Sequence, residues 1–168
     1  MLFRASFIAV FLALSATALE VKSLTLSAEP GHFNASTLGA PASSVTLAGT
    51  LRMVALSGAK GWPPAAYIGL QQGPNRNNSV QVLAIRNREI DDHLVVGYRL
   101  VVSGKEVKVA SLENVSLTAT VPVSIVFKNG VASISVNGSP PVEVQTPFRE
   151  VAPYVSVSSG HAEFAIEP

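Results

Sequence analysis

The segment that decides the fold reads SIVFKNGVASISV and covers residues 124–136. Apolar residues recur at every second position on both sides of Asn129-Gly130. Such alternation is typical of a half-buried β-strand. An Asn-Gly pair between two alternating runs favours a type I′ turn, because both central residues of that turn need positive φ. The segment therefore predicts a tight antiparallel hairpin.

The same pattern extends over most of the chain. Short runs rich in Val, Ile, Leu and Thr alternate with polar residues, and Gly, Pro, Asn or Asp separate the runs. We expect strands near residues 21–27, 44–56, 66–72, 79–88, 94–103, 105–111, 115–120, 122–128, 131–137, 142–146, 153–159 and 162–167. Turn signals at this spacing favour a sandwich or barrel over βαβ units. The sequence predicts an all-β fold, a two-sheet antiparallel β-sandwich.

The N-terminal segment has the three parts of a secretory signal. Arg4 precedes an apolar run over residues 5–14, and Ala16-x-Ala18 has the small residues that a signal peptidase accepts. A membrane-spanning helix needs roughly 20 apolar residues, more than this run supplies. We expect residues 1–18 to be a signal peptide and residues 19–168 a single β-sandwich domain. The mature protein would be secreted, or periplasmic in a bacterium.

The charge balance narrows the choice of partner. The chain has 12 Lys and Arg against 11 Asp and Glu, and removal of Arg4 leaves 11 of each. A neutral chain without a basic run is a poor ligand for nucleic acid or an anionic membrane surface. We therefore expect no nucleic-acid partner and no membrane insertion after signal cleavage. The chain has no cysteine, which excludes disulfides and thiol chemistry.

Three segments carry a resemblance to a known superfamily. Val123 to Gly138 holds the Asn-Gly hairpin and a second strand that ends in Asn137-Gly138; the other two are Tyr154 to Phe164 and Ala66 to Gln71. They resemble, respectively, the late strands, the closing strands and an early inner-sheet strand of the concanavalin A-like lectin/glucanase superfamily. The resemblance implies a jelly roll of two curved antiparallel sheets, with a concave face that binds glycans in many members.

The resemblance also implies where a glucanase would carry its carboxylates, in a Glu-x-Asp-x-x-Glu or Glu-x-Asp-x-Glu strand. Glu89-Ile90-Asp91-Asp92-His93 begins this way but has His93 in place of the last Glu, and it lies at a turn. We interpret it as a polar loop, so glucanase activity is unsupported. Its three acids are too few for a calcium site. We expect no catalytic residues, no metal and no cofactor.

Glycan binding needs aromatic platforms and planar polar groups. Trp62 stands in a Gly-rich turn before two prolines, where it either stacks on a sugar or plugs the end of the sandwich. Predicted strands carry Gln71 on one face and place arginines on neighbouring strands, either as a ligand surface or as an ordinary solvated face. The candidate ligand-binding residues are Trp62, Gln71, Arg86, Arg88 and Arg99.

Three functions follow from these observations. The first is a secreted, non-catalytic concanavalin A-like module that binds an extracellular or cell-wall glycan. The second is a structural or protein-interaction domain, which would show an apolar patch or an open edge strand. The third is an unrecognised glycan hydrolase or lyase, which requires a carboxylate, His or Tyr cluster on the concave face. The three functions are distinguished by the positions, relative to the groove, of Glu106, Glu113, Glu143 and Glu150. The sequence leaves the oligomeric state open.

Signal cleavage is directly testable. Expression of the full chain in a secretory host should release a protein that begins at Leu19, because Ala16 and Ala18 form the cleavage pattern. Intact mass and N-terminal sequencing of the secreted protein would check this. An intact N-terminus beginning at Met1, found in the membrane fraction, would contradict it.

Overall fold

The computed structural model describes residues 20–167, so the predicted signal peptide lies outside the described residues. Within this range the chain forms ten antiparallel strands and contains no helix that could span a membrane. The strands are β1 (Lys22–Thr37), β2 (Ser44–Ala55), β3 (Ala65–Gln71), β4 (Ser79–Ile85), β5 (His93–Val102), β6 (Lys105–Ser116), β7 (Thr120–Lys128), β8 (Val131–Val136), β9 (Val142–Gln145) and β10 (Ala152–Ile166).

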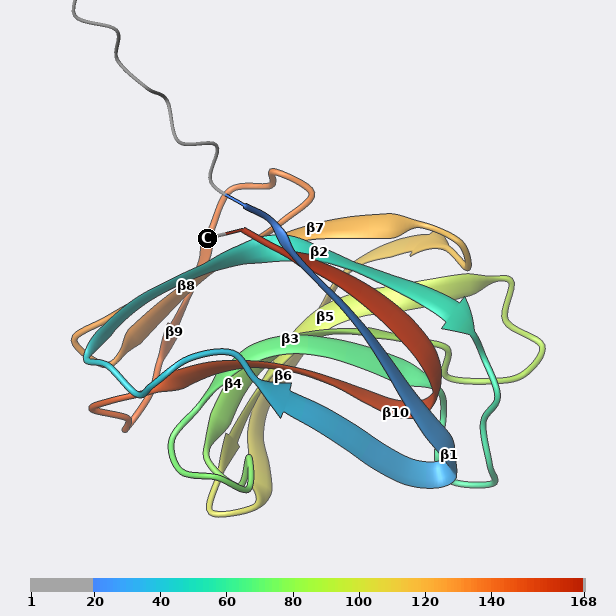
Figure 1. Ribbon diagram of the computed structural model, residues 1–168, viewed down its shortest axis with the longest axis horizontal. Helices are drawn as coiled ribbons and strands as arrows, with labels where there is room; N and C mark the ends of the chain where they lie inside the picture. The colour runs from blue at the N-terminus through green and yellow to red at the C-terminus, as the bar shows by residue number, and fades with distance from the viewer. Residues whose placement is uncertain (1–19, 168) are drawn as a thin grey trace, which may run out of the picture.

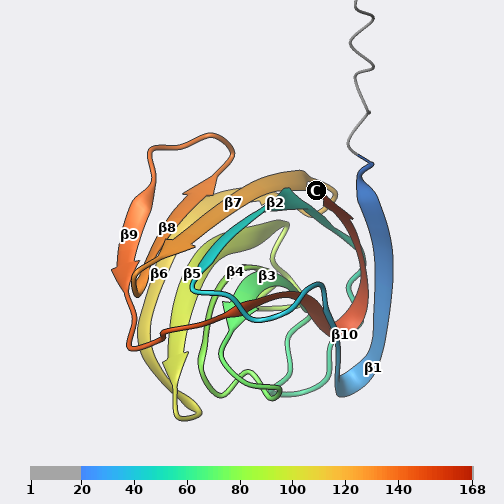
Figure 2. The same cartoon turned by 60° about the vertical axis from the view of Figure 1, so that its left-hand side comes forward.

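The ten strands are hydrogen-bonded in one continuous antiparallel sheet, which folds at β1 and β10 into two layers that we call sheet I and sheet II (Figure 1). Sheet I has the order β6-β5-β4-β3, followed by residues 152–158 of β10 and residues 33–37 of β1. Sheet II starts with residues 22–28 of β1, continues with residues 161–166 of β10, and ends with β2-β7-β8-β9. Figure 2 shows how strongly the strands curl. The predicted two-sheet antiparallel sandwich is confirmed.

The hairpin of residues 124–136 has the predicted geometry. Val123 to Lys128 pairs with Val131 to Val136 in an unbroken register, and φ is 51° at Asn129 and 78° at Gly130. Two positive φ values in a two-residue loop are the mark of a type I′ turn. This local signal needed no tertiary information, which is why it could be read from the sequence.

Three other expectations about strands were wrong. Residues 153–159 and 162–167 belong to one strand, β10, which bends at Ser159 and Gly160. The short strand expected at 21–27 is the first part of β1, which crosses a register shift after Ala28 and continues to Thr37. The two strands expected at 105–111 and 115–120 are likewise replaced by one, β6, which runs through a register irregularity between Ser111 and Glu113 and ends at Ser116, before the turn into β7. In each case a bulge or another irregularity of register interrupts the alternation without ending the strand.

The core lies between the two sheets. Alternate residues of nearly every strand in both sheets point into it, and its largest fully buried side chains include Phe127, Leu51, Ile68 and Leu94. Tyr98 on β5 is also part of this core and is 4% exposed. A second, smaller apolar cluster of Ala65, Tyr67 and Leu83 lies on the other face of sheet I. We call that face, which points away from the core, the outer face of sheet I.

The bend in β10 is the position most sensitive to a side chain. Gly160 has a φ of +106°, and a Cβ there would overlap the backbone oxygen of Ala55 on β2. Gly160→Ala should therefore lower the free energy of unfolding by about 3 kcal/mol or more, from backbone strain and the clash together. Urea unfolding measures this loss.

Gly138→Ala is the matched control. Gly138 has a φ of +71°, but nothing lies within 4 Å of its would-be Cβ. This variant should lose only the about 1–2 kcal/mol that a left-handed backbone costs an L-residue. Equal losses for the two variants would show that β10 and β2 do not depend on close approach at residue 160.

Candidate functional site

Polar side chains are buried on the outer face of sheet I. Gln71, Ser79, Gln81, Ser156 and Ser158 are each at most 5% exposed. The corresponding face of sheet II is open to solvent, since β2 and β7 alternate there between core residues and half-buried or exposed ones. Buried polar groups cost free energy unless they are paired, so they are seldom retained without a role. The outer face of sheet I is therefore the candidate site.

One row of residues crosses four strands of this face in register. Tyr154 on β10 lies opposite Gly69 on β3, Gly69 opposite Gln81 on β4, and Gln81 opposite Arg99 on β5. A Cβ at Gly69 would come within 2.6 Å of the Gln81 Cβ. The missing side chain at residue 69 lets Tyr154 reach over β3 and contact Gln81.

Gln81 links the row into a hydrogen-bond network. With its amide oxygen toward β5 it accepts from Arg99, at 3.0 Å from Nη2, and its NH₂ group donates to the Tyr154 hydroxyl. This orientation satisfies both ends of the amide. Burial raises the pKa of Tyr154 well above its ordinary value, against the opposing effects of Ser79 and the Arg76 and Arg99 charges. The tyrosine therefore remains a neutral phenol.

Two aromatic rings and two guanidinium groups stack above this network. The rings of Phe33 and Tyr67 have centroids 5.7 Å apart. The Arg76 guanidinium carbon lies 3.4 Å from the Phe33 centroid, and that of Arg99 lies 4.9 Å from the Tyr67 centroid. Both distances are within the range of cation–π attraction. Burial raises the pKa of Tyr67, which the Arg99 and Arg76 charges partly offset.

Beside the stack is a polar cavity of about 250 Å³, which we call the arginine pocket. It is lined by Asn75, Arg76, Asn77, Gln81, Arg99, Val101, Gly104 and Glu106. Two loops form its walls, and backbone hydrogen bonds join them: Gly104 N donates to Asn77 O at 2.8 Å, and Ser103 N to the Asn78 side chain at 2.9 Å. The pocket is thus largely preformed, as ligand sites usually are.

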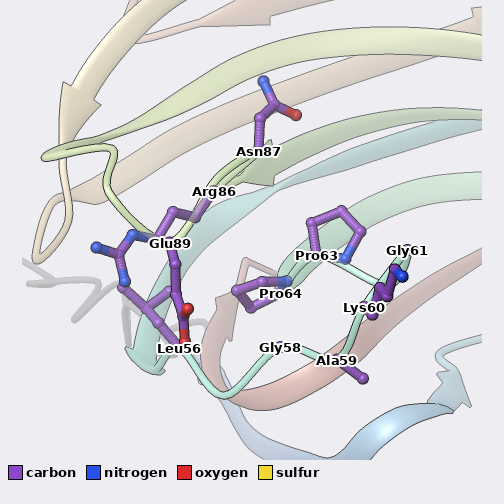
Figure 3. A pocket seen from close by; sticks show the side chains of 10 residues that line it. All are labelled: Leu56, Gly58, Ala59, Lys60, Gly61, Pro63, Pro64, Arg86, Asn87 and Glu89. Carbon is purple, nitrogen blue, oxygen red and sulfur yellow. The ribbon is translucent and has the colours of Figure 1, made fainter.

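A second cavity of about 390 Å³ lies in the loop between β2 and β3 (Figure 3). The 58–61 segment and the Pro63-Pro64 pair form one side, and Arg86, Asn87 and Glu89 form the other. We call it the loop pocket. Trp62, which is 45% exposed, belongs to the same loop and pairs through its backbone with Ala59. By register this loop adjoins Ala65, four residues along β3 from the row of Gly69 and Arg99, roughly 13 Å away.

The structure separates the five residues predicted from the sequence. Gln71 and Arg99 share the outer face of sheet I, where the Gln71 amide donates to Thr37 Oγ1 at 3.4 Å. Trp62 and Arg86 belong to the loop region at the other end. Arg88 is bound locally to Asp91, at 2.9 Å from Nε and 2.8 Å from Nη2.

The expected alignment of Arg86 and Arg88 on a strand was wrong, because β4 ends at Ile85. The two residues lie in the following turn, where Arg86 Nε donates to the Asp91 carbonyl oxygen at 2.9 Å. The Arg88 hydrogen bond holds the pKa of the Asp91 carboxyl below its usual value. This confirms that the acidic segment around Asp91 is a polar loop.

Sequence reasoning missed Arg76 and Phe33. Arg76 lies in a Pro- and Asn-rich loop, and Phe33 follows Gly31, beyond the end of the expected first strand. Neither has an alternating pattern around it that could indicate a shared face. Only the tertiary fold brings the two side chains together over sheet I. Among residues 20–167, no three His, Asp or Glu side chains gather as metal ligands would.

Comparison with known proteins shows likeness at the level of structure. No family model and no curated relative matches the sequence. The carbohydrate-binding module CBM66 from Bacillus subtilis superposes with a TM-score of 0.60 at 9% identity, over 90% of this chain and 94% of that one. The metal-free carbohydrate recognition domain of Emp46p gives 0.58 at 10% identity, over 88% and 85%.

The fold is a concanavalin A-like jelly roll. The alginate lyase AlyC3, solved in complex with dimannuronate, also superposes, with a TM-score of 0.54 at 14% identity over 88% of this chain and 72% of that one. The resemblance inferred from the sequence is thereby confirmed for the fold. Identities this low carry no information about individual site residues.

The Gln81 network should be important for stability. Gln81→Met keeps the approximate volume but leaves the Tyr154 hydroxyl without its Gln81 partner and Arg99 without its acceptor. We expect a loss of about 2–3 kcal/mol in the free energy of unfolding, the cost of unpaired polar groups in a buried site. Arg52→Ala, which breaks a 3.7 Å surface ion pair with Glu163, should lose less than about 1 kcal/mol. Urea unfolding that ranks the two variants in the opposite order would contradict the network.

Proposed function

We propose that this chain is a secreted, non-catalytic module that binds a glycan in the arginine pocket. The observation that carries the proposal is the pair of ring-stacked guanidinium groups, Arg76 and Arg99, that line one preformed cavity. Secretion rests on the signal pattern of residues 1–18.

The pocket offers the groups that a sugar needs. Guanidinium and amide groups at Arg76, Arg99, Asn75 and Asn77 can donate to hydroxyl and ring oxygens in a fixed geometry. A volume of about 250 Å³ is slightly below the range for drug-sized ligands, which suits one sugar unit. Next to Arg99 in register is Val109 on β6, which is 60% exposed and extends the face toward solvent.

The structural neighbours add support from fold-level analogy. A carbohydrate-binding module, a carbohydrate recognition domain and a lyase solved with dimannuronate share this sandwich. Such analogy raises the expectation of a glycan ligand without identifying one. The residues that line the arginine pocket support a glycan ligand independently of this analogy.

The carboxylates of the site favour binding over hydrolysis. Glycoside hydrolysis uses two carboxyl groups about 5–9 Å apart across the sugar. Among the described residues that line the arginine pocket, Glu106 is the single carboxylate, and Glu113, Glu143 and Glu150 lie outside its lining. Glu106 is itself 3.9 Å from Arg99.

A lyase is the second candidate, because Tyr67 and Tyr154 meet the requirement for a tyrosine cluster with raised pKa. Proton transfer to or from a substrate needs a hydroxyl within about 3 Å of the reacting group. Tyr154 is fully buried and Tyr67 is 5% exposed. This burial favours a structural role for both phenols. The exposed Val107 and Val109 on edge strand β6 are the feature that a protein-interaction role would use.

A glycan array with the protein secreted from the full-length gene tests the proposal. We expect binding to one class of saccharide, weakened at least tenfold by Arg99→Ala because that residue lines the pocket. Trp62→Ala should bind as tightly as the wild type, since Trp62 lies toward the opposite end of sheet I. Titration calorimetry measures the affinities, and thermal unfolding checks that both variants fold.

Three outcomes would contradict the proposal. A blank array would exclude glycan binding and would favour a protein-interaction role for the exposed edge strand β6. Release of shorter saccharides from a bound glycan would show that the module is catalytic. A loss of binding in Trp62→Ala but not in Arg99→Ala would place the ligand in the loop region.

A further inference from the structure

We infer that the ligand of the arginine pocket is an acidic sugar, whose anionic group, a uronic-acid carboxylate or a sulfate ester, is held between Arg76 and Arg99. The inference rests on the proposed function and specifies the substrate class for the same pocket. Three independent observations support it: the charge balance of the pocket, the unused donors of Arg76, and the backbone of Arg76.

The pocket has more positive than negative charge. Arg76 and Arg99 line it with Glu106 as the described carboxylate. Glu106 is 3.9 Å from Arg99 and its side chain is 47% exposed, so the pair neutralises Arg99 only weakly. Arg76 has no carboxylate within 4.0 Å among residues 20–167. A bound anion would supply the missing charge.

Arg76 retains donors that a ligand can use. Arg99 uses Nε and Nη2 on the Gln81 amide and points Nη1 toward Glu106. Arg76 is only partly exposed, and its guanidinium donates no hydrogen bond to another side chain or backbone group among residues 20–167. Burial is the main cause that lowers the pKa of Arg76. Stacking on Phe33 uses the face of the guanidinium and leaves its edge, with five N–H donors, free. Such an edge fits carboxylate and sulfate oxygens in pairs.

The backbone at Arg76 is held in an unusual conformation. Its φ is +57°, a left-handed value that is uncommon for residues other than Gly, Asn and Asp. Gln72 N donates to Asn78 O at 2.8 Å and closes the loop, while Asn75 accepts from Asn77 N at 3.3 Å beside Arg76. Three asparagines in this loop tolerate that backbone better than Arg does, yet Arg occupies the position. Backbone strain of this kind is commonly found where a side chain must be aimed at a ligand.

The near-zero net charge of the chain indicates how many anionic groups of a ligand the site recognises. With 11 basic and 11 acidic residues after residue 18, long-range attraction to a polyanion is weak. Two arginines in one small pocket instead suit a single anionic group on one sugar unit. We therefore expect selectivity for short acidic oligosaccharides, distinct from general binding to nucleic acid or highly charged polymers.

Matched trisaccharides test this inference. The probes are trigalacturonate with its neutral counterpart galactotriose, trimannuronate with mannotriose, and sulfated galactotriose. We expect at least one acidic trisaccharide to bind at least tenfold more tightly than its neutral counterpart in titration calorimetry. The uronate and sulfate arms distinguish the two sources of negative charge. Raising the salt concentration from 50 to 500 mM should reduce the preference, because screening weakens charge pairing.

Two arginine variants provide the control. Arg76→Gln removes one of the two positive charges of the pocket, so it should weaken binding of the acidic trisaccharide at least tenfold more than binding of its neutral counterpart and thereby abolish the preference. Arg52→Gln removes one charge from the outer face of sheet II, where Arg52 pairs with Glu163, and should keep the preference. Thermal unfolding verifies that both variants fold.

The outcomes separate this inference from the proposed function. Equal affinity for an acidic trisaccharide and its neutral counterpart would overturn the inference and leave glycan binding intact. A preference that persists in Arg76→Gln, or disappears equally in Arg52→Gln, would assign it to overall charge and overturn the inference as well. No binding to any trisaccharide or array glycan would overturn both.

Discussion

The passage of β10 from one sheet to the other is the constraint on which the rest of this structure depends. Residues 152–158 pair with β3, residues 161–166 pair with β2, and β1 follows both halves. The change of direction uses positive φ at Ser159 and Gly160, where β2 comes too close for a side chain. Because one strand belongs to both sheets, their relative placement is set covalently, and a common core closes between them.

The candidate site follows from the same strand. The first half of β10 supplies Tyr154, Ser156 and Ser158 to the outer face of sheet I, and Tyr154 begins the row that continues through Gly69 and Gln81 to Arg99. Satisfied polar networks in a low-dielectric setting are rigid, because each broken bond leaves an expensive unpaired group. The row therefore positions the Arg99 guanidinium before any ligand arrives. Preorganisation of this kind reduces the entropy that binding would otherwise lose.

The sequence predicted the features that depend on residues close together along the chain, and missed those that depend on contacts between distant segments. The hairpin at Asn129-Gly130 and most strand positions depend on local alternation and turn chemistry, and these predictions were confirmed. The continuity of β1, β6 and β10 was missed, because a bulge resembles a turn when its partner strand is unknown. Period-two spacing identified Gln71 and Arg99 as candidates on separate predicted strands, and the sheet register then places both on one face. Such spacing could not find Arg76 or Phe33, whose meeting depends on a loop closing over a strand from elsewhere in the chain.

The two tyrosines of the site are buried, whereas its two arginines are partly exposed and can contact a ligand. Tyr154 and Tyr67 are inside the layer formed by Phe33, Arg76 and Arg99, so that layer is the chemical surface that a ligand meets. It presents fixed positive charge backed by aromatic rings, and its few exposed acid–base groups are poorly suited to proton transfer. Cations held over rings lose little rotamer entropy on binding, since stacking has already restricted them. A surface of this composition can discriminate between ligands by charge and shape, and this is the physical basis on which we propose recognition as the role of the site.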